Sequence, residues 1–141
     1  MDVQHSEEFR VLVTGSRGWT DESAIQTAFD MVESHNRDQR GVVVLVHGTA
    51  AGADTLAEHE AVRRGWTIEA HPAHWETHTD QCPSWHWALP KCKMAGHRRN
   101  AEMVSSGADV CFAFIKDKSP GASACLALAE KANIPAHVWR E

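Results

Sequence analysis

The sequence predicts an α/β fold with a doubly wound, mostly parallel sheet and helices on both of its faces. Short apolar runs without polar alternation recur along the chain, and such runs are typical of strands that a parallel sheet buries on both faces. Four of these runs are followed by a loop and a helical pattern before the next run begins, and this order produces parallel βαβ units. With 141 residues and 43% hydrophobic content, the chain suits a single domain, which we place at residues 1–141.

The first strand, over residues 9–14, runs directly into a loop of small and basic residues, Gly15-Ser16-Arg17-Gly18-Trp19. An amphipathic helix follows, and we expect it to end before a polar loop over residues 34–40. An arginine in a glycine loop at the end of a buried strand favours phosphate binding by Arg17, and a solvated loop charge is the alternative. Trp19 is expected either to stack on a base or to close the hydrophobic core.

The second strand covers residues 42–46, and we expect it to lie in the centre of the sheet. It breaks into a loop of mostly small residues that contains His47, Gly48, Thr49, Ala50, Gly52 and Asp54. Small residues let the backbone pass close to a ligand, and the free N–H groups at the start of the next helix favour phosphate or another anion. A tight turn whose glycines serve packing alone is the alternative. Because parallel strands end at the same sheet edge, we expect this loop and the first loop to line one crevice.

The third strand, over residues 66–70, leads into a loop-like insertion that we place at residues 76–94. This region supplies four zinc-ligand types in a C-x3-H-x5-C-x4-H pattern, namely Cys82, His86, Cys92 and His97. The spacing lacks the short C-x2-C hook of common structural zinc sites. Zinc binding, a disulfide between Cys82 and Cys92, and two free thiols all remain open, and we favour free thiols.

The last third of the chain continues the alternation of helix and strand. We expect a helix over residues 95–104, a buried strand over 110–115, a third small-residue loop over 119–123, a helix over 124–132 and a closing strand over 134–139. Cys111 and Cys125 lie in apolar segments, so we expect them to be reduced core residues.

The charge balance limits the kinds of partner. A formal net charge of −5 and a sequence pI near 6.0 argue against a broad positive surface for nucleic acid, whereas local arginine pockets are compatible with nucleotides. No stretch approaches the ~20 apolar residues of a membrane helix, and the polar tail over residues 1–8 is unlike a signal peptide. We expect a cytoplasmic protein with no membrane segment, no extended nucleic-acid surface and no cofactor.

Six short motifs follow one another along residues 9–139: V-T-G-S-R, V-H-G-x-A-x-G-A-D, H-P-A-x-W, A-G-x-x-R-N-x-x-M, G-A-D-V-x-x-A-F and S-x-G-A-S-x-x-x-x-L-A. In this order they resemble the SLOG superfamily, in its branch of small bacterial and phage YspA-like proteins. That superfamily has a Rossmann-like fold, and it includes the lonely-guy phosphoribohydrolases, which cleave nucleoside monophosphates, and sensor domains for nucleotide-derived signals.

The resemblance implies a nucleotide-type ligand held by three segments. These are Gly15 to Arg17, His47 to Asp54, and the third small-residue loop with Gly121, Ala122 and Ser123. The matching motif on the helix over residues 95–104 contributes Arg99 and Asn100. Base selectivity is expected from Trp19, from Trp75 and from the insertion.

The chain departs from the hydrolases of this superfamily at one motif. The hydrolases resemble one another in an arginine on the middle helix and in P-G-G-x-G-T-x-x-E, whose Glu is thought to act on the ribose. Here Arg99 matches the arginine, but Ala122 replaces the Thr and Cys125 stands in the place of the Glu. A neutral thiol cannot replace a carboxylate in N-glycosidic cleavage. Glu102 can substitute in principle, although an ion pair with Arg98 or Arg99 one turn away is the simpler interpretation.

We therefore predict a binding protein, a sensor or a sequestering protein, for a nucleotide or nucleotide-derived ligand. The alternative is a nucleoside-monophosphate phosphoribohydrolase that uses Arg99 and Glu102, and a third possibility is a partner protein with a vestigial pocket. Trp85, Trp87 and Leu89 in the insertion, together with the homo-oligomers common among SLOG proteins, favour a homodimer or larger homo-oligomer. The alternative role for the insertion is a lid over its own sheet edge.

Overall fold

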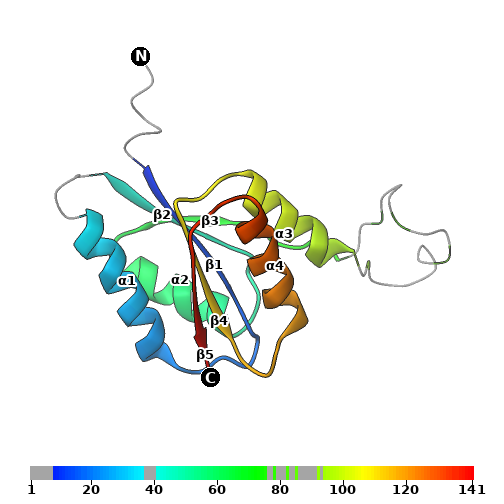
Figure 1. Cartoon of the computed structure of the whole chain (residues 1–141), viewed down its shortest axis with the longest axis horizontal. Helices are drawn as coiled ribbons and strands as arrows, with labels where there is room; N and C mark the ends of the chain where they lie inside the picture. The colour runs from blue at the N-terminus through cyan, green and yellow to red at the C-terminus, as the bar shows by residue number, and fades with distance from the viewer. Residues whose placement is uncertain are drawn as a thin grey trace, which may run out of the picture.

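The computed structural model describes residues 8–36, 41–75, 78, 82, 85, 92 and 94–141. The elements follow in the order β1 (Glu8–Gly15), α1 (Glu22–Asn36), β2 (Val42–His47), α2 (Ala53–Arg63), β3 (Thr67–Ala70), α3 (Ala95–Ser105), β4 (Val110–Ile115), α4 (Pro120–Lys131) and β5 (Ala136–Arg140) (Figure 1). Strand and helix alternate throughout. The insertion lies between β3 and α3.

The five strands of the described chain form one parallel sheet in the order β3-β2-β1-β4-β5. The middle strand is β1, where Val11 pairs with Leu45 of β2 on one side and with Val110 of β4 on the other. The strand that we predicted to be central, β2, lies between β1 and β3, so it is an interior strand but not the middle one. The predicted α/β class is correct, and the sheet is parallel throughout rather than mostly parallel.

Helices cover both faces of the sheet, as Figure 1 shows for α1 and α2 on one side and α3 and α4 on the other. Alternate residues of each strand point to opposite faces. Val11 and Val13 therefore pack against α1 and α2 in a core that includes Phe29 and Trp66, whose rings lie 4.4 Å apart. Leu12, between them, packs against α3 and α4. The fold is thus doubly wound and Rossmann-like, as predicted.

Several element boundaries differ from the prediction. Helix α1 continues through Asn36, so the segment from residue 34 onward is not entirely a loop. Helix α4 begins at Pro120 rather than at residue 124, because a proline has its φ fixed at a helical value and is well suited to the first helical position. The third small-residue loop is therefore mostly the first turn of a helix, and only Ser119 precedes it.

None of the helices in the described ranges is both long enough and apolar enough to cross a bilayer. Most of the predicted polar tail, residues 1–7, lies outside the described residues. Within the insertion, the described positions are His78, Cys82, Trp85, Cys92 and Met94. The zinc-ligand candidate His86 and the predicted packing of Trp87 and Leu89 likewise fall outside the described residues.

Candidate functional site

A cavity of about 520 Å³ lies at the carboxyl ends of the strands. The chain passes from β1 to β2 and β3 in one direction, then crosses to β4 and β5 on the other side of β1. Loops after β1 and β4 therefore separate above the sheet, and such a switch point is where open α/β sheets bind ligands. The cavity is lined by the residues that follow β1, β2 and β4 and by the start of α3.

Ser16 fixes the shape of the loop after β1. Its hydroxyl donates to the Lys116 carbonyl at 3.1 Å and accepts the Lys116 N–H at 2.7 Å, so it joins the loops after β1 and β4. Its own carbonyl accepts the N–H of Ala53, the first residue of α2, at 3.2 Å. Because its proton is already donated within the protein, the Ser16 hydroxyl holds the cavity wall rather than offering a donor to a ligand.

Asp54 stabilises the loop after β2 through hydrogen bonds to its backbone. Its Oδ2 accepts the N–H groups of Gly48 and Ala50, each at 3.1 Å. Its Oδ1 is buried and has no hydrogen-bond partner among the residues that the structure describes. Asp54 is only 4% exposed yet contributes to the cavity lining. Burial raises the pKa of this carboxyl, against the opposing effect of its backbone hydrogen bonds.

Gly52 allows the loops after β1 and β2 to touch. Its φ is +74°, and a Cβ at this position would lie 2.2 Å from the Arg17 carbonyl oxygen. A side chain at residue 52 would therefore clash with the loop after β1 and would also be strained by the positive φ. The close contact requires glycine for packing, and this packing sets the position of the arginine-bearing loop.

Arg99 reaches into the cavity from α3. Its Nη1 donates to the Gly48 carbonyl at 2.5 Å and its Nε donates to the Asn100 side chain at 2.9 Å. Its guanidinium lies directly over the backbone of Gly48, where a Cβ would come within 2.5 Å of Nη1. Arg98, the neighbouring candidate for the family arginine, instead contacts the sulfur atoms of Cys82 and Cys92. Arg99 is therefore the arginine of the cavity.

Cys125 lies beneath the cavity rather than in its lining. It is fully buried, and burial raises the pKa of its thiol to about 11, while a hydrogen bond with the Thr14 side chain lowers it in part. The thiol is therefore neutral at pH 7. It provides no negative charge at the position where the resemblance to the hydrolases led us to expect a glutamate.

The charges around the cavity favour an anion with hydroxyl groups. Among the described lining residues, Arg17, Arg99 and Lys116 are the strong cations and Asp54 is the acid. The lining also includes the first residues of α4, whose N-cap Ser119 makes no side-chain capping hydrogen bond. A helix N-terminus with free N–H groups adds to the attraction for phosphate.

Most of the predicted site residues lie together. Ten of them line the cavity: Gly15, Ser16, Arg17, Ala50, Asp54, Trp75, Arg99, Asn100, Gly121 and Ala122. Gly48 and Thr49 line a smaller adjoining depression, which shares Arg17, Trp75 and Arg99 with the main cavity.

Four predicted residues stand outside both linings. Trp19 is 2% exposed and packs against Phe114, so it closes the core and cannot stack on a base. His47 is buried, and because its Nδ1 accepts the Thr49 N–H, its Nε2 carries the proton that faces Glu58. Gly52 acts through its contact with the loop after β1. Ser123 is exposed on α4, outside the cavity lining.

Glu102, the alternative catalytic residue, also lies outside the cavity lining. It contacts His71 at 2.5 Å. Of the two arginines predicted to pair with it, Arg99 donates to Gly48 and Asn100, and Arg98 contacts the cysteine sulfur atoms. His71 also contacts Glu69 at 2.7 Å, and Glu69 forms a bidentate pair with Arg10. This network ties β3 to α3 and β1 and gives Glu102 a structural role.

Sequence reasoning missed eight of the lining residues: Thr14, Gly18, Gly96, His97, Met103, Lys116, Ser119 and Pro120. Lys116 carried the clearest signal, because it follows the buried strand β4 directly and parallel strands end at one edge. Gly96 supports Trp75, since a Cβ at residue 96 would lie 3.2 Å from the tryptophan ring.

Comparison with known proteins agrees with the class that this fold defines, a Rossmann-like α/β protein. The YspA, cpYpsA-related SLOG family model matches residues 9–78. The Gene 61 protein of Mycobacterium phage D29 is 41% identical over 131 residues, which cover 89% of this chain and 92% of the phage protein. The chain belongs to the YspA, cpYpsA-related SLOG family.

Two solved structures share the fold. DNA processing protein A (DprA) from Streptococcus pneumoniae superposes with a TM-score of 0.63 at 16% identity over 92% of this chain, which spans 50% of the length of that chain. The Moco carrier protein from Chlamydomonas reinhardtii gives a TM-score of 0.57 at 19% identity, covering 95% of this chain and 78% of the other. At these identities the likeness concerns the fold alone.

Proposed function

We propose that the protein binds a nucleotide or nucleotide-derived ligand in the switch-point cavity, as a sensor or a sequestering protein. The observation that carries this proposal is the buried Asp54 carboxylate, whose Oδ1 has no partner among the described residues, in one cavity with three strong cations. A nucleotide matches this combination, because its phosphate complements the cations and its ribose hydroxyls can donate to a carboxylate oxygen. A volume of about 520 Å³ suits such a ligand.

The lining residues support one orientation of the ligand. Arg17 and Lys116 line the same cavity as the first residues of α4, so we expect the phosphate near that helix N-terminus. Asp54, in the first turn of α2, also lines the cavity and is the expected partner of the ribose. Trp75, held against Gly96, offers an aromatic face for the base.

Calorimetric titration tests the proposal with three kinds of probe: the common nucleoside monophosphates, the matching nucleosides and inorganic phosphate. We expect at least one nucleoside monophosphate to bind more tightly than its nucleoside and than phosphate, because it alone engages both the cations and Asp54. A chain that binds no nucleoside monophosphate, or binds one no better than phosphate, contradicts the proposal.

A second candidate function is phosphoribohydrolase activity. The observation that favours it is that Asp54 supplies a cavity carboxylate from α2 although Cys125 has replaced the one expected on α4. Incubation with nucleoside monophosphates, followed by chromatography for free base, separates a hydrolase from a binding protein. Hydrolysis that is lost in Asp54→Asn supports the enzyme, whereas binding without release of base supports the sensor or sequestering role.

DNA is not the ligand that we propose, although the name of DNA processing protein A connects that fold relative with DNA. The net charge of −5 gives weak support for contacts along a phosphate backbone. The cations of the cavity lining instead share one cavity whose lining also includes the buried Asp54 carboxylate.

A further inference from the structure

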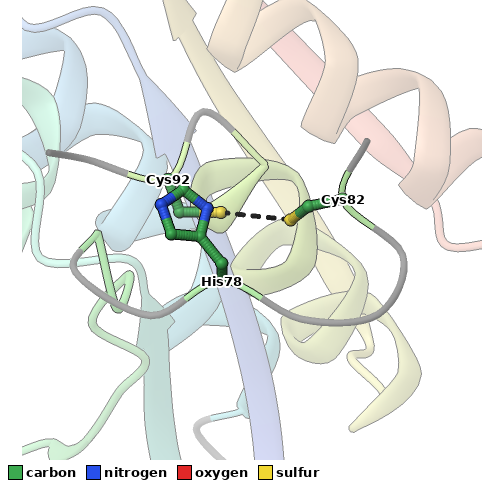
Figure 2. Close-up of side chains that lie close together, drawn as sticks. All are labelled: His78, Cys82 and Cys92. Atoms are coloured by element: carbon green, nitrogen blue, oxygen red, sulfur yellow. Dashed lines mark hydrogen bonds between the residues drawn. The ribbon is translucent and has the colours of Figure 1, made fainter. Parts of the chain in front are cut away.

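A second cluster of reactive side chains lies outside the cavity, between the loop after β3 and the start of α3. It consists of His78, Cys82 and Cys92, which Figure 2 shows pointing toward one another. One ligand atom from each residue lies within 4.8 Å of the other two. Cys92 is fully buried and Cys82 is 6% exposed. Neither the proposed nucleotide site nor the core of the sheet makes use of these three side chains.

The separation of the two sulfur atoms, 3.5 Å, fits shared coordination of one ion. Two thiolates on a tetrahedral zinc at about 2.3 Å each place their sulfur atoms about 3.8 Å apart. A disulfide instead requires about 2.05 Å, and no disulfide joins Cys82 and Cys92 in this structure. Two thiolates and one imidazole form a ligand set that zinc prefers over the oxygen-loving cations.

Arg98 gives an independent indication that these sulfur atoms are suited to carry negative charge. Its Nη1 lies 3.3 Å from the Cys92 sulfur and 3.7 Å from the Cys82 sulfur. A neighbouring guanidinium stabilises thiolates, which are the form that binds metal. In zinc sites, hydrogen bonds to the ligand atoms from the surrounding residues fix the ligands in place.

We propose that His78, Cys82 and Cys92 bind one Zn²⁺ ion. A water molecule or a further side chain completes the tetrahedron. Of the four ligands considered from the sequence, Cys82 and Cys92 belong to this site, His97 lies in the cavity lining instead, and His86 falls outside the described residues. His78 takes the place of the predicted histidines, in an H-x3-C-x9-C pattern.

The ion would join two parts of the cavity wall. The Cys92 N–H donates to the Trp75 carbonyl, and the Cys92 carbonyl accepts the N–H of Ala95, the first residue of α3, at 3.2 Å. Trp75 and Ala95 also pack against the two cysteines. The proposed role is therefore structural: the ion fixes the insertion to the base of α3, next to the side chain of Trp75.

Cobalt titration tests the site in the full chain, purified in reductant and stripped of metal with a chelator. We expect one equivalent of Co²⁺ to give a sulfur-to-cobalt charge-transfer band and the visible bands of tetrahedral cobalt, and Zn²⁺ to displace it. Cys82→Ser and Cys92→Ser should lose most of the charge-transfer band, and His78→Ala should weaken Zn²⁺ binding at least about tenfold. Cys111→Ala removes a buried thiol outside the cluster and should bind as the wild type does.

Circular dichroism of each variant establishes that it is folded before metal binding is compared. Equal cobalt binding by the wild type and the Cys82→Ser/Cys92→Ser double variant overturns the proposal. So does unchanged Zn²⁺ affinity in a folded His78→Ala variant, and so does a wild type that binds no metal in reductant. These readouts use only metal, so their failure is distinguishable from a failure of nucleotide binding.

Discussion

Replacing Asp54 by asparagine alters a buried carboxylate while it keeps the size of the side chain. Oδ2 accepts the N–H groups of Gly48 and Ala50, and the amide oxygen of asparagine can accept both. Oδ1, which has no partner among the described residues, becomes an NH₂ group that cannot accept a hydrogen bond. The variant therefore removes a charged acceptor from the proposed ribose site and leaves the loop after β2 supported.

The expected magnitude follows from the hydrogen bond that is lost. A hydrogen bond to a charged group contributes about 1.5–3 kcal/mol, so nucleoside monophosphate binding should weaken about 10- to 150-fold. Because the variant also removes a negative charge from the cavity, its affinity for inorganic phosphate should stay the same or rise. Opposite responses of the nucleotide and of phosphate are the signature of a ribose contact.

Although nucleotide affinity should fall in Asp54→Asn, the stability of the unliganded chain should stay the same or rise. Burial raises the pKa of Asp54 above its value in the unfolded chain. Between these two pKa values the folded chain binds more protons, so the contribution of Asp54 to the free energy of unfolding falls as pH rises through this window. At pH 7, which lies above the pKa of Asp54 in the unfolded chain, this raised pKa is a cost to folding, and Asp54→Asn should unfold at the same or a higher temperature than the wild type.

Calorimetry with nucleoside monophosphates and with phosphate, together with thermal unfolding, measures these effects. Asp109→Asn is the matched control, because its carboxylate also accepts a backbone N–H, from Arg10 at 2.8 Å, but lies outside the cavity lining. Nucleotide affinity that is unchanged in Asp54→Asn refutes the ribose contact. A variant that loses stability and both affinities together shows instead that the carboxylate only supports the loop.

Further predictions concern the anion site, the loop contact, an ion pair and assembly. Arg17→Ala should weaken nucleoside monophosphate binding by about 1.5–3 kcal/mol in calorimetry, because a charged hydrogen bond is lost. Gly52→Val should abolish that binding yet keep the far-ultraviolet circular dichroism spectrum, because the clash is confined to the loop after β1. The hydrogen bonds from Arg10 lower the Glu69 pKa to about 2 from 4.5, so Glu69→Gln should cost stability above about pH 4.5. This cost should shrink as pH falls toward 2. By light scattering, the chain should have at least twice its 15.6 kDa mass, and Trp85→Ser with Trp87→Ser should reduce it.

Each of these predictions has an outcome that contradicts it. Arg63→Ala, which removes a solvent-exposed arginine outside the cavity, should leave binding unchanged, and an Arg17→Ala variant that behaves in the same way excludes the arginine from the site. Normal binding of nucleoside monophosphates by Gly52→Val would show that the contact between residue 52 and the loop after β1 is not needed for binding. A stability difference for Glu69→Gln that is constant from pH 7 to pH 2 contradicts the ionic pairing, and a 15.6 kDa mass at micromolar concentration rejects the dimer.

The sequence predicted the fold well because its strongest signals are local. Strand β4 was predicted with its observed bounds, Val110–Ile115, because six buried apolar residues stand between polar segments. The meeting of the loops after β1 and β2 followed from topology alone, since neighbouring parallel strands end at one edge. The start of α4 was predicted four residues late, because the run from Pro120 through Ser123 was interpreted as a loop although proline at the first helical position is favourable.

The side-chain roles were harder to predict, because they depend on contacts between distant residues. Trp19 and His47 follow their strands as a ligand-binding residue would, yet one packs against Phe114 and the other is held by Glu58. Lys116 was missed because its place beside Ser16 comes from the pairing of β1 with β4, in which paired residues such as Val11 and Val110 are 99 residues apart in the sequence. We predicted His97 and His86 as ligand candidates near the cysteines, whereas His78 is the histidine that lies beside Cys82 and Cys92 among the described residues.

An amide-resolved NMR titration with nucleoside monophosphates tests the central claim most directly, because it reports both binding and its position. We expect saturable shifts at Arg17, Ala50 and Gly121 and at the indole N–H of Trp75. The amides around Phe9, at the other end of β1, should be unchanged. The absence of shifts with every nucleotide at millimolar concentration, or shifts confined to residues outside the cavity lining, would contradict it.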